Sequence, residues 1–138
     1  MSINTSHYSE FIMATGSADR TIGVWDIRSL KTKLYCFKGH KDVVTNVRFS
    51  KTQRNFLASS SHDRNINVWD LTKTGQYQTD QQKAEGPSEL IFSHGGHTDN
   101  ISDLSWNMGE KLMLASVAED NVLQVWQIGK GHYESLQN

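Results

Sequence analysis

The chain has a single cysteine, a single proline and almost no net charge. The scarcity of cysteine and of charge each argues against a class of protein. Because Cys36 is the one cysteine in 138 residues, no internal disulfide can form, which fits a reducing compartment. We expect its side chain to be a small buried hydrophobe in a strand. The net charge of −1 lacks the basic excess of a nucleic-acid-binding domain, so we expect no direct contact with nucleic acid. No apolar run approaches the ~20 residues that span a bilayer, and a signal-peptide pattern is absent at the start, so we expect no membrane contact.

The sequence also lacks a sustained 3.6-residue apolar period, which argues against helices. It has instead short bursts of alternating β-branched and aromatic residues, separated by Gly, Asn, Asp and Ser. The bursts occupy residues 11–15, 22–26, 34–37, 43–49, 56–60, 66–69, 90–92, 101–106, 112–117 and 122–128. These lengths and compositions predict an all-β fold.

The dominant feature that is present is one pattern repeated three times, at residues 14–26, 58–70 and 115–127. In each copy an Asp precedes a Trp by six residues: Asp19 and Trp25, Asp63 and Trp69, Asp120 and Trp126. A Gly-His pair precedes the later two copies, and His40 and His97 each stand 29 residues before the Trp. Repeats of roughly 40–45 residues with these marks are the signature of β-propeller blades. Propellers are mostly interaction platforms, so the pattern favours a binding protein over an enzyme.

The recurring side chains predict a structural bracket, by which we mean a hydrogen-bonded set of His, Ser or Thr, Asp and Trp in each repeat. A turn Asp is costly to bury without partners, and a His from the preceding loop can donate to it. A hydroxyl four residues before the Asp can bond the His, and the indole N–H of the Trp can bond that hydroxyl. The sets are His40, Ser59, Asp63 and Trp69 in the second repeat, His97, Ser116, Asp120 and Trp126 in the third, and Thr15, Asp19 and Trp25, without a His, in the first.

Two other interpretations of these residues, a catalytic triad and a metal site, are weaker than the structural bracket. A His, Asp and Ser group resembles a hydrolase triad, but its recurrence at one spacing, ended each time by a Trp, is typical of a structural bracket. His94 and His97 resemble a zinc pair, but no Cys or acidic residue stands at ligand spacing nearby. We therefore expect no catalytic residue, no metal site and no cofactor.

The repeats divide the chain into an incomplete blade at residues 10–37, a blade at 38–93 and a last blade at 94–128. Residues 1–9 contain no Gly-His pair, so we expect an irregular start that lacks the opening half of the first repeat. The distance between Trp residues grows from 44 to 57 residues after Trp69, which predicts an inserted polar surface loop at 72–89. Residues 129–138 form a polar tail. The chain thus amounts to about two and a half blades.

One end of the sheets is expected to carry the interaction surface. If His40 bonds Asp63, the loop before each blade and the turn within it lie at the same end, around the central channel. Glu119 with Asn121 is the pair there suited to grip a basic peptide, and a merely solvated rim is the alternative. Other residues expected at this end are Ala18, Val43, Thr45, His62, Asn100 and Ser102.

Several stretches carry a more specific resemblance: Tyr8 to Arg20, Glu89 to Thr98, Ile101 to Asn107 and Ala115 to Trp126. Together they resemble the retinoblastoma-binding, Msi-type WD-repeat histone chaperones, over about Tyr8 to Ile128. That family supplies the small histone-binding subunit of chromatin assembly, acetyltransferase, deacetylase, nucleosome-remodelling and Polycomb complexes. The resemblance implies the last part of a seven-bladed propeller, a non-catalytic scaffold with histones H3 and H4 as partners, and a location in the nucleus and also the cytoplasm. In the family a strand from the far N-terminus closes the last blade, so we expect residues 94–128 to lack their closing strand.

The resemblance also implies two binding sites. In the family an acidic, proline-containing loop forms part of a side groove for the first helix of histone H4. It matches here at Glu85, Gly86, Pro87, Glu89 and Leu90, although Gln82, Lys83 and Ala84 make it less acidic. On the channel face Glu119 and Asn121 match positions that the family uses for basic tails such as that of histone H3. Asn100 and Thr45 are further candidate contacts there, although their residue types depart from the family's.

Two and a half blades leave two sheet faces uncovered. We expect the chain either to be part of a longer protein or to self-associate. The less acidic loop also leaves open a WD-repeat adaptor for non-histone partners, such as a ubiquitin-ligase substrate receptor, or a non-functional fragment.

Overall fold

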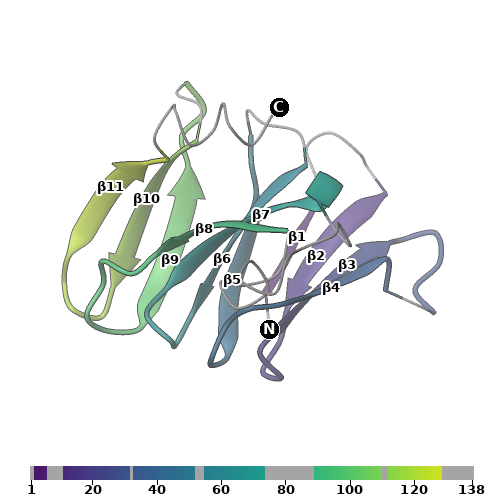
Figure 1. Cartoon of the computed structure of the whole chain (residues 1–138), viewed down its shortest axis with the longest axis horizontal. Helices are drawn as coiled ribbons and strands as arrows, with labels where there is room; N and C mark the ends of the chain where they lie inside the picture. Colours follow the sequence, from purple (N-terminus) through teal and green to yellow (C-terminus); the bar gives the residue numbers. More distant parts are fainter. Residues whose placement is uncertain are drawn as a thin grey trace, which may run out of the picture.

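The computed structural model describes residues 2–5, 11–31, 33–51, 55–73, 89–109 and 112–128. These residues form eleven strands and one short 3-10 helix, arranged as three antiparallel sheets that stand side by side (Figure 1). The fold is a partial β-propeller, which confirms the all-β prediction. In the described part of the chain, no helix is long and apolar enough to span a membrane.

The first sheet has four strands in chain order: β1 (Ser2–Thr5), β2 (Ile12–Gly16), β3 (Thr21–Asp26) and β4 (Tyr35–Lys38). The prediction of an irregular start is wrong for residues 2–5, because β1 pairs with β2 over its whole length. Its Ser-Ile-Asn-Thr sequence alternates too weakly to identify a strand. Pairing with a neighbour, rather than intrinsic propensity, makes it one.

The second sheet repeats this order with β5 (Val44–Phe49), β6 (Phe56–Ser61), β7 (Ile66–Asp70) and β8 (Leu90–His94). The 3-10 helix, Leu71–Lys73, follows β7, and residues 74–88 of the expected insertion lie outside the described residues. The third sheet has β9 (Ile101–Trp106), β10 (Met113–Ala118) and β11 (Leu123–Gln127). The tail at 129–138 lies outside the described residues.

The opening strands of the three sheets are neighbours. β1 contacts β5, and β5 contacts β9. The Asn46 side-chain amide donates to the backbone carbonyl of Ser102 over 3.2 Å, which ties β5 to β9. These strands occupy the position that lines the central axis of a propeller.

Each sheet has two distinct faces because side chains alternate along a strand. We call the side that carries Trp25, Trp69 or Trp126 the tryptophan face. We call the opposite side, which carries Val24, Val68 or Val125, the valine face. The tryptophan face of each later sheet packs on the valine face of the sheet before it.

Two apolar clusters result from this packing. Between the first and second sheets lie Ala14, Ile22, Val24, Phe37, Val44, Val47, Phe49, Leu57 and Trp69. Between the second and third lie Phe56, Ala58, Ile66, Val68, Ile91, Ile101, Leu104, Trp106, Leu112, Leu114, Ala118 and Ile128. Because the middle sheet is covered on both sides, every residue of β6 and β7 is buried.

The expectation of a buried Cys36 is wrong. Cys36 lies in β4, the outer strand of the first sheet, and is exposed. It points to the tryptophan face of this sheet, opposite Gly23, and no described sheet covers that face. Strand membership was predictable here, but burial depended on a neighbour.

Candidate functional site

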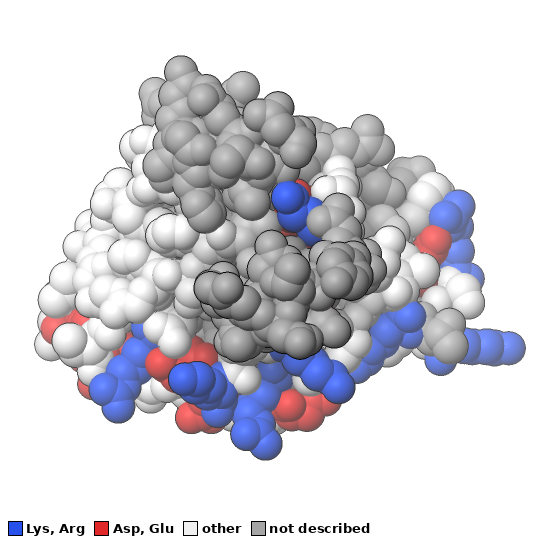
Figure 2. Space-filling model, in the orientation of Figure 1, with Lys and Arg blue, Asp and Glu red and all other residues white. Residues whose placement is uncertain are grey.

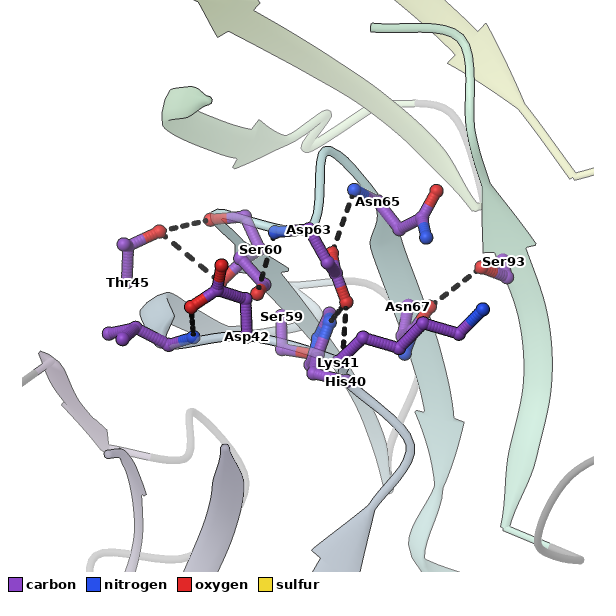
Figure 3. Close-up of polar contacts among 12 residues, drawn as sticks. His40, Lys41, Asp42, Thr45, Ser59, Ser60, Asp63, Asn65, Asn67 and Ser93 are labelled. Carbon is purple, nitrogen blue, oxygen red and sulfur yellow. Dashed lines mark hydrogen bonds and ion pairs between the residues drawn. The ribbon is translucent and has the colours of Figure 1, made fainter. Parts of the chain in front are cut away.

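The second sheet brings the four predicted bracket side chains together. Figure 3 shows three of them, His40, Ser59 and Asp63. His40 lies with Nδ1 2.9 Å from Asp63 Oδ2 and Nε2 2.7 Å from Ser59 Oγ. The indole N–H of Trp69 donates to the same Ser59 oxygen over 2.8 Å. His40, Ser59 and Trp69 are buried, so water cannot replace these bonds.

The partners assign the proton positions in this chain of bonds. The Asp63 carboxylate can only accept, so His40 Nδ1–H donates to it. Nε2 is then an acceptor, and the Ser59 hydroxyl group donates a hydrogen bond to it. The Ser59 oxygen in turn accepts from the indole N–H of Trp69. Every polar side-chain atom of the set has a partner, which is another member for all but Asp63 Oδ1, and that oxygen accepts from the backbone N–H of Asn65. A serine whose oxygen is fully buried and already bound by an indole N–H is not placed to attack a substrate, so the group is structural rather than a hydrolase triad.

The Asp63 carboxyl group stays ionised despite its surroundings. Burial raises its pKa, but hydrogen bonds from the His40 ring and from the backbone N–H groups of Lys41 and Asn65 outweigh burial and lower the pKa below the usual value. The two amides donate over 2.9 Å each, to different carboxylate oxygens. One carboxylate therefore joins the loop before β5 to the turn after β6.

Close packing explains why Gly precedes His in this motif. A Cβ at Gly39 would lie 2.8 Å from Cη2 of Trp69, closer than real contacts allow. At Gly96 a Cβ would lie 2.6 Å from Oε1 of Gln124 and 2.8 Å from Nε2 of His94. Gly39 is thus required by the close approach of the loop to the rigid Trp69 ring, whereas the atoms nearest to Gly96 are the ends of side chains.

The third sheet assembles the same set less tightly. Trp126 Nε1 donates to Ser116 Oγ over 3.2 Å, and His97 Nε2 lies 2.7 Å from that oxygen. His97 Nδ1 stands 3.4 Å from Asp120 Oδ2 and makes no hydrogen bond within the described part of the chain. The backbone N–H of Thr98, with smaller contributions from other donors, lowers the pKa of the Asp120 carboxyl. No described sheet packs on the valine face of this sheet.

The first sheet keeps half of the bracket. Trp25 Nε1 donates to Thr15 Oγ1 over 3.0 Å. Asp19 is exposed and accepts from Thr21, over 3.0 Å from its backbone and 2.6 Å from its hydroxyl, and these bonds lower its pKa. Among the described residues, no histidine joins this set.

His94 has a packing role. Its ring stacks on Trp126 with centroids 4.3 Å apart, and its Nε2 lies 2.8 Å from Gln124 Oε1. His97 belongs to the bracket. Within the described ranges, no cluster of three His, Cys, Asp or Glu side chains could hold a metal ion.

Three sheets of one strand order, tied by a recurring bracket, define a repeat protein of the β-propeller class. The family model for the WD domain, G-beta repeat (WD40), matches residues 1–26, 31–70 and 88–127, and the chain belongs to this family. The first match covers β1 to β3, whereas the second and third matches begin before β4 and β8, so the first repeat lacks the counterpart of these opening strands. WD40 repeats are non-catalytic scaffolds for protein interactions, which is the class of function this chain has.

The bracket places the loops that precede the sheets and the turns within them at one end, the lower edge in Figure 1. At the third sheet, the backbone N–H of Glu119 donates to the carbonyl of Asn100 over 2.9 Å. Asp99 is adjacent, and Asn121 follows the turn Asp, so Glu119, Asn100 and Asn121 lie close together. Thr45 lies apart, in β5, where its hydroxyl is 3.2 Å from both the carbonyl and the hydroxyl of Ser60 (Figure 3).

The turns share a backbone conformation that the sequence analysis did not predict. The residue after the turn Asp adopts a positive φ in each sheet: 72° at Arg20, 69° at Arg64 and 62° at Asn121. Asn accepts this left-handed conformation readily, whereas Arg does so at a cost. The sequence signal for this conformation was the position directly after the turn Asp, which holds Arg in two repeats and Asn in the third.

Charge is distributed unevenly along this end. Figure 2 shows Lys, Arg, Asp and Glu side chains gathered at the lower edge of the molecule. In the first and second sheets, the strand ends, loops and turns at this end include Arg20, Lys38, Lys41 and Arg64 together with Asp19, Asp42 and Asp63. The third sheet contributes Asp99, Glu119 and Asp120, and the described residues of 94–128 include no Lys or Arg. Among the described residues, the rim is therefore acidic at the third sheet and carries charges of both signs at the other two.

The structure describes two of the five residues expected in a side groove, Glu89 and Leu90. Glu89 is buried, and its carbonyl accepts from the backbone N–H of Asp70 over 2.8 Å. Leu90 lies in β8 and packs on the cluster between the first two sheets. Neither presents an acidic surface. Glu85, Gly86 and Pro87 lie outside the described residues.

Proposed function

We propose that this WD40 chain binds basic peptide segments, those of histones H3 and H4, at the acidic rim of its third sheet. It would do so as a scaffold subunit of nuclear chromatin complexes: assembly, acetyltransferase, deacetylase or Polycomb-type. The observation that carries the proposal is the juxtaposition of Glu119 with Asn100 beside Asp99, through a 2.9 Å backbone bond. The resemblance to histone-binding WD-repeat proteins supports the choice of partner.

The chemistry of the rim suits an extended Lys- and Arg-rich peptide. Glu119, Asp99 and Asn121 are exposed, so their side chains can meet a ligand without rearrangement of the sheet. Carboxylates pair with cationic side chains, and the amides of Asn100 and Asn121 can bond the peptide backbone. Because exposed charges are screened by salt, the affinity should fall as ionic strength rises.

Binding of a fluorescent histone H3 tail peptide, followed by polarisation, tests the proposal. The double variant Glu119→Gln and Asp99→Asn should weaken binding about 10-fold, since each exposed charge pair contributes up to about 1 kcal/mol. The matched control is His62→Gln with Asp42→Asn, which changes the corresponding positions of the second sheet and should leave binding unchanged. Binding that ignores salt and both variants would refute the rim as the site.

A second candidate follows from the basic residues at the other two sheets. Arg20 and Arg64 stand at equivalent turn positions, and Lys41 is exposed in the loop before β5. An adaptor for acidic, non-histone partners would use these side chains. Polarisation with an acidic peptide, lost in Arg20→Gln with Arg64→Gln but retained in the Glu119 variant, would favour this function over histone binding.

A further inference from the structure

The outer strand of the first sheet, β4 (Tyr35–Lys38), has an open edge in basic surroundings. It pairs with β3 on one side, and no described strand pairs with its other edge. Between Asp26 and Asp42 the chain has five Lys or Arg residues and no Asp or Glu, although the net charge of the whole chain is −1. Figure 2 shows Lys and Arg side chains along the right of the molecule, where Figure 1 places β3 and β4. A row of backbone N–H and C=O groups therefore stands unpaired beside several cations.

Most of the cations beside β4 have no acidic partner in the part of the chain that the structure describes. Arg28 is the exception, because its guanidinium group donates to the Asp26 carboxylate over 2.6 Å. Lys33 and Lys38 are exposed, and within the described ranges neither forms an ion pair. The Lys33 ammonium group lies 5.6 Å from the centroid of the Trp25 ring, which places it on the tryptophan face. The two lysines can therefore meet a negatively charged ligand.

The two faces of β4 differ in chemistry at this edge. Tyr35 and Phe37 lie on the valine face, whereas Cys36 and Lys38 lie on the tryptophan face. The Tyr35 and Phe37 rings stack with centroids 6.2 Å apart, and Phe37 stacks in turn on Trp69 at 5.2 Å. Phe37 is fully buried but Tyr35 is 38% exposed, so this aromatic stack runs from the core to the open edge. One face of the edge is therefore aromatic, and the other carries a cation.

The exposure of this edge follows from the place of β4 within its sheet. The middle sheet has a neighbour on both faces, and its outer strand β8 corresponds to β4. Ser93, which corresponds to Cys36, is exposed in that sheet, and so is Gly95, which corresponds to Lys38. A neighbouring sheet therefore does not cover these positions of the repeat.

We propose that β4 takes an extended acidic segment of a partner protein as an added strand. The backbone of the segment pairs with the open edge, and its side chains alternate between the two faces. Because neighbours across paired strands share a face, apolar residues of the segment lie beside Tyr35 and acidic residues lie beside Lys38. A basic histone tail or a second copy of β4 is disfavoured, since like charges would adjoin. The proposal is independent of histone binding at the rim.

Fluorescence polarisation of the labelled peptide Glu-Val-Glu-Val-Glu-Val with the full chain tests the proposal. Lys33→Gln with Lys38→Gln should weaken binding about 10-fold, the loss expected for two exposed charge pairs. The matched control, Lys41→Gln with Arg64→Gln, removes two exposed charges from the rim of the second sheet and should leave binding unchanged. Unchanged thermal unfolding of both double variants verifies the fold. Absence of saturable binding, an equal loss in the two double variants, or tighter binding of a single-stranded oligonucleotide would each overturn the proposal.

Two further measurements separate strand addition from attraction between charges alone. Because alternate N–H groups of a strand point to the same edge, N-methylation of the peptide's valines and N-methylation of its glutamates should differ in effect. One form should lose binding and the other should keep it. Cys36 is the one cysteine of the chain and is exposed in β4, so its alkylation should slow in proportion to the fraction of the chain that is bound. Equal binding of the two N-methylated peptides, or a Cys36 alkylation rate that bound peptide leaves unchanged, would show that no strand is added to β4.

Discussion

The bracket of the second sheet makes the sharpest prediction, because a single oxygen serves two buried groups. Ser59→Ala removes the acceptor of the Trp69 indole N–H, bonded over 2.8 Å, and the donor to His40 Nε2, at 2.7 Å. All three residues are buried, so water does not reach the orphaned atoms. Each unsatisfied buried group costs about 1–3 kcal/mol, so we expect the free energy of unfolding to fall by about 2–4 kcal/mol.

The other two sheets supply graded comparisons in the same molecule. Ser116→Ala disrupts a looser set, in which Trp126 is half-buried and its bond is 3.2 Å, so the expected loss is about 1–2 kcal/mol. Thr15→Val removes a hydroxyl from a half-buried pair with Trp25, where water can substitute, and should cost about 0.5 kcal/mol.

Urea unfolding of the three variants, monitored by tryptophan fluorescence and circular dichroism, measures these losses. The order of destabilisation should be Ser59, then Ser116, then Thr15. If Thr15→Val lowered the free energy of unfolding as much as Ser59→Ala, burial would not explain how strongly the bracket stabilises the fold. If Ser59→Ala cost less than about 0.5 kcal/mol, the hydrogen bonds would not stabilise the fold at all.

Two further predictions concern the same bracket. Gly39→Ala brings a Cβ within 2.8 Å of the Trp69 ring and should lower the free energy of unfolding by about 1–3 kcal/mol. Gly109→Ala is the control, because the nearest atom there is 3.4 Å away and the free energy of unfolding should change little. Equal thermal unfolding of the two variants would contradict the packing argument. Because the pKa of the Asp63 carboxyl is lower in the folded chain than its ordinary value of about 4, its stabilisation is present above that value and is lost as pH falls through the folded pKa. Asp63→Asn should therefore flatten the loss of stability in urea titrations below about pH 4, and an unchanged pH profile would show that this carboxyl is not responsible.

The periodicity of the sequence was sufficient to anticipate the architecture and much of the bracket. A hydroxyl, an Asp and a Trp at constant spacing occupy constant positions on paired strands, because side chains alternate with a period of two. The His position followed from the chemistry of a buried carboxylate. The sequence could not distinguish a tight bracket from a loose one, since the 2.9 Å and 3.4 Å distances from His to Asp in the second and third sheets depend on packing between sheets.

Burial was the property least accessible from sequence. Glu89 is acidic and was expected at a binding surface, yet the return of the chain to β8 buries it. Cys36 belongs to a strand as expected but is exposed, because β4 is an outer strand on an uncovered face. In both cases the outcome depended on segments distant in the chain, which local patterns do not encode.

The sequence by itself determined every described strand except β1, the repeats, the family and the identities of the bracket residues, because these rest on local alternation and fixed spacing. Only the tertiary structure decided which identical residues are core and which are surface. Val24, Val68 and Val125 occupy one position of one motif, but two are buried and the third is open. The difference arises because the hydrophobic faces of a sheet are buried by its neighbours, and the number of neighbours is a property of the assembled sheets rather than of any repeat.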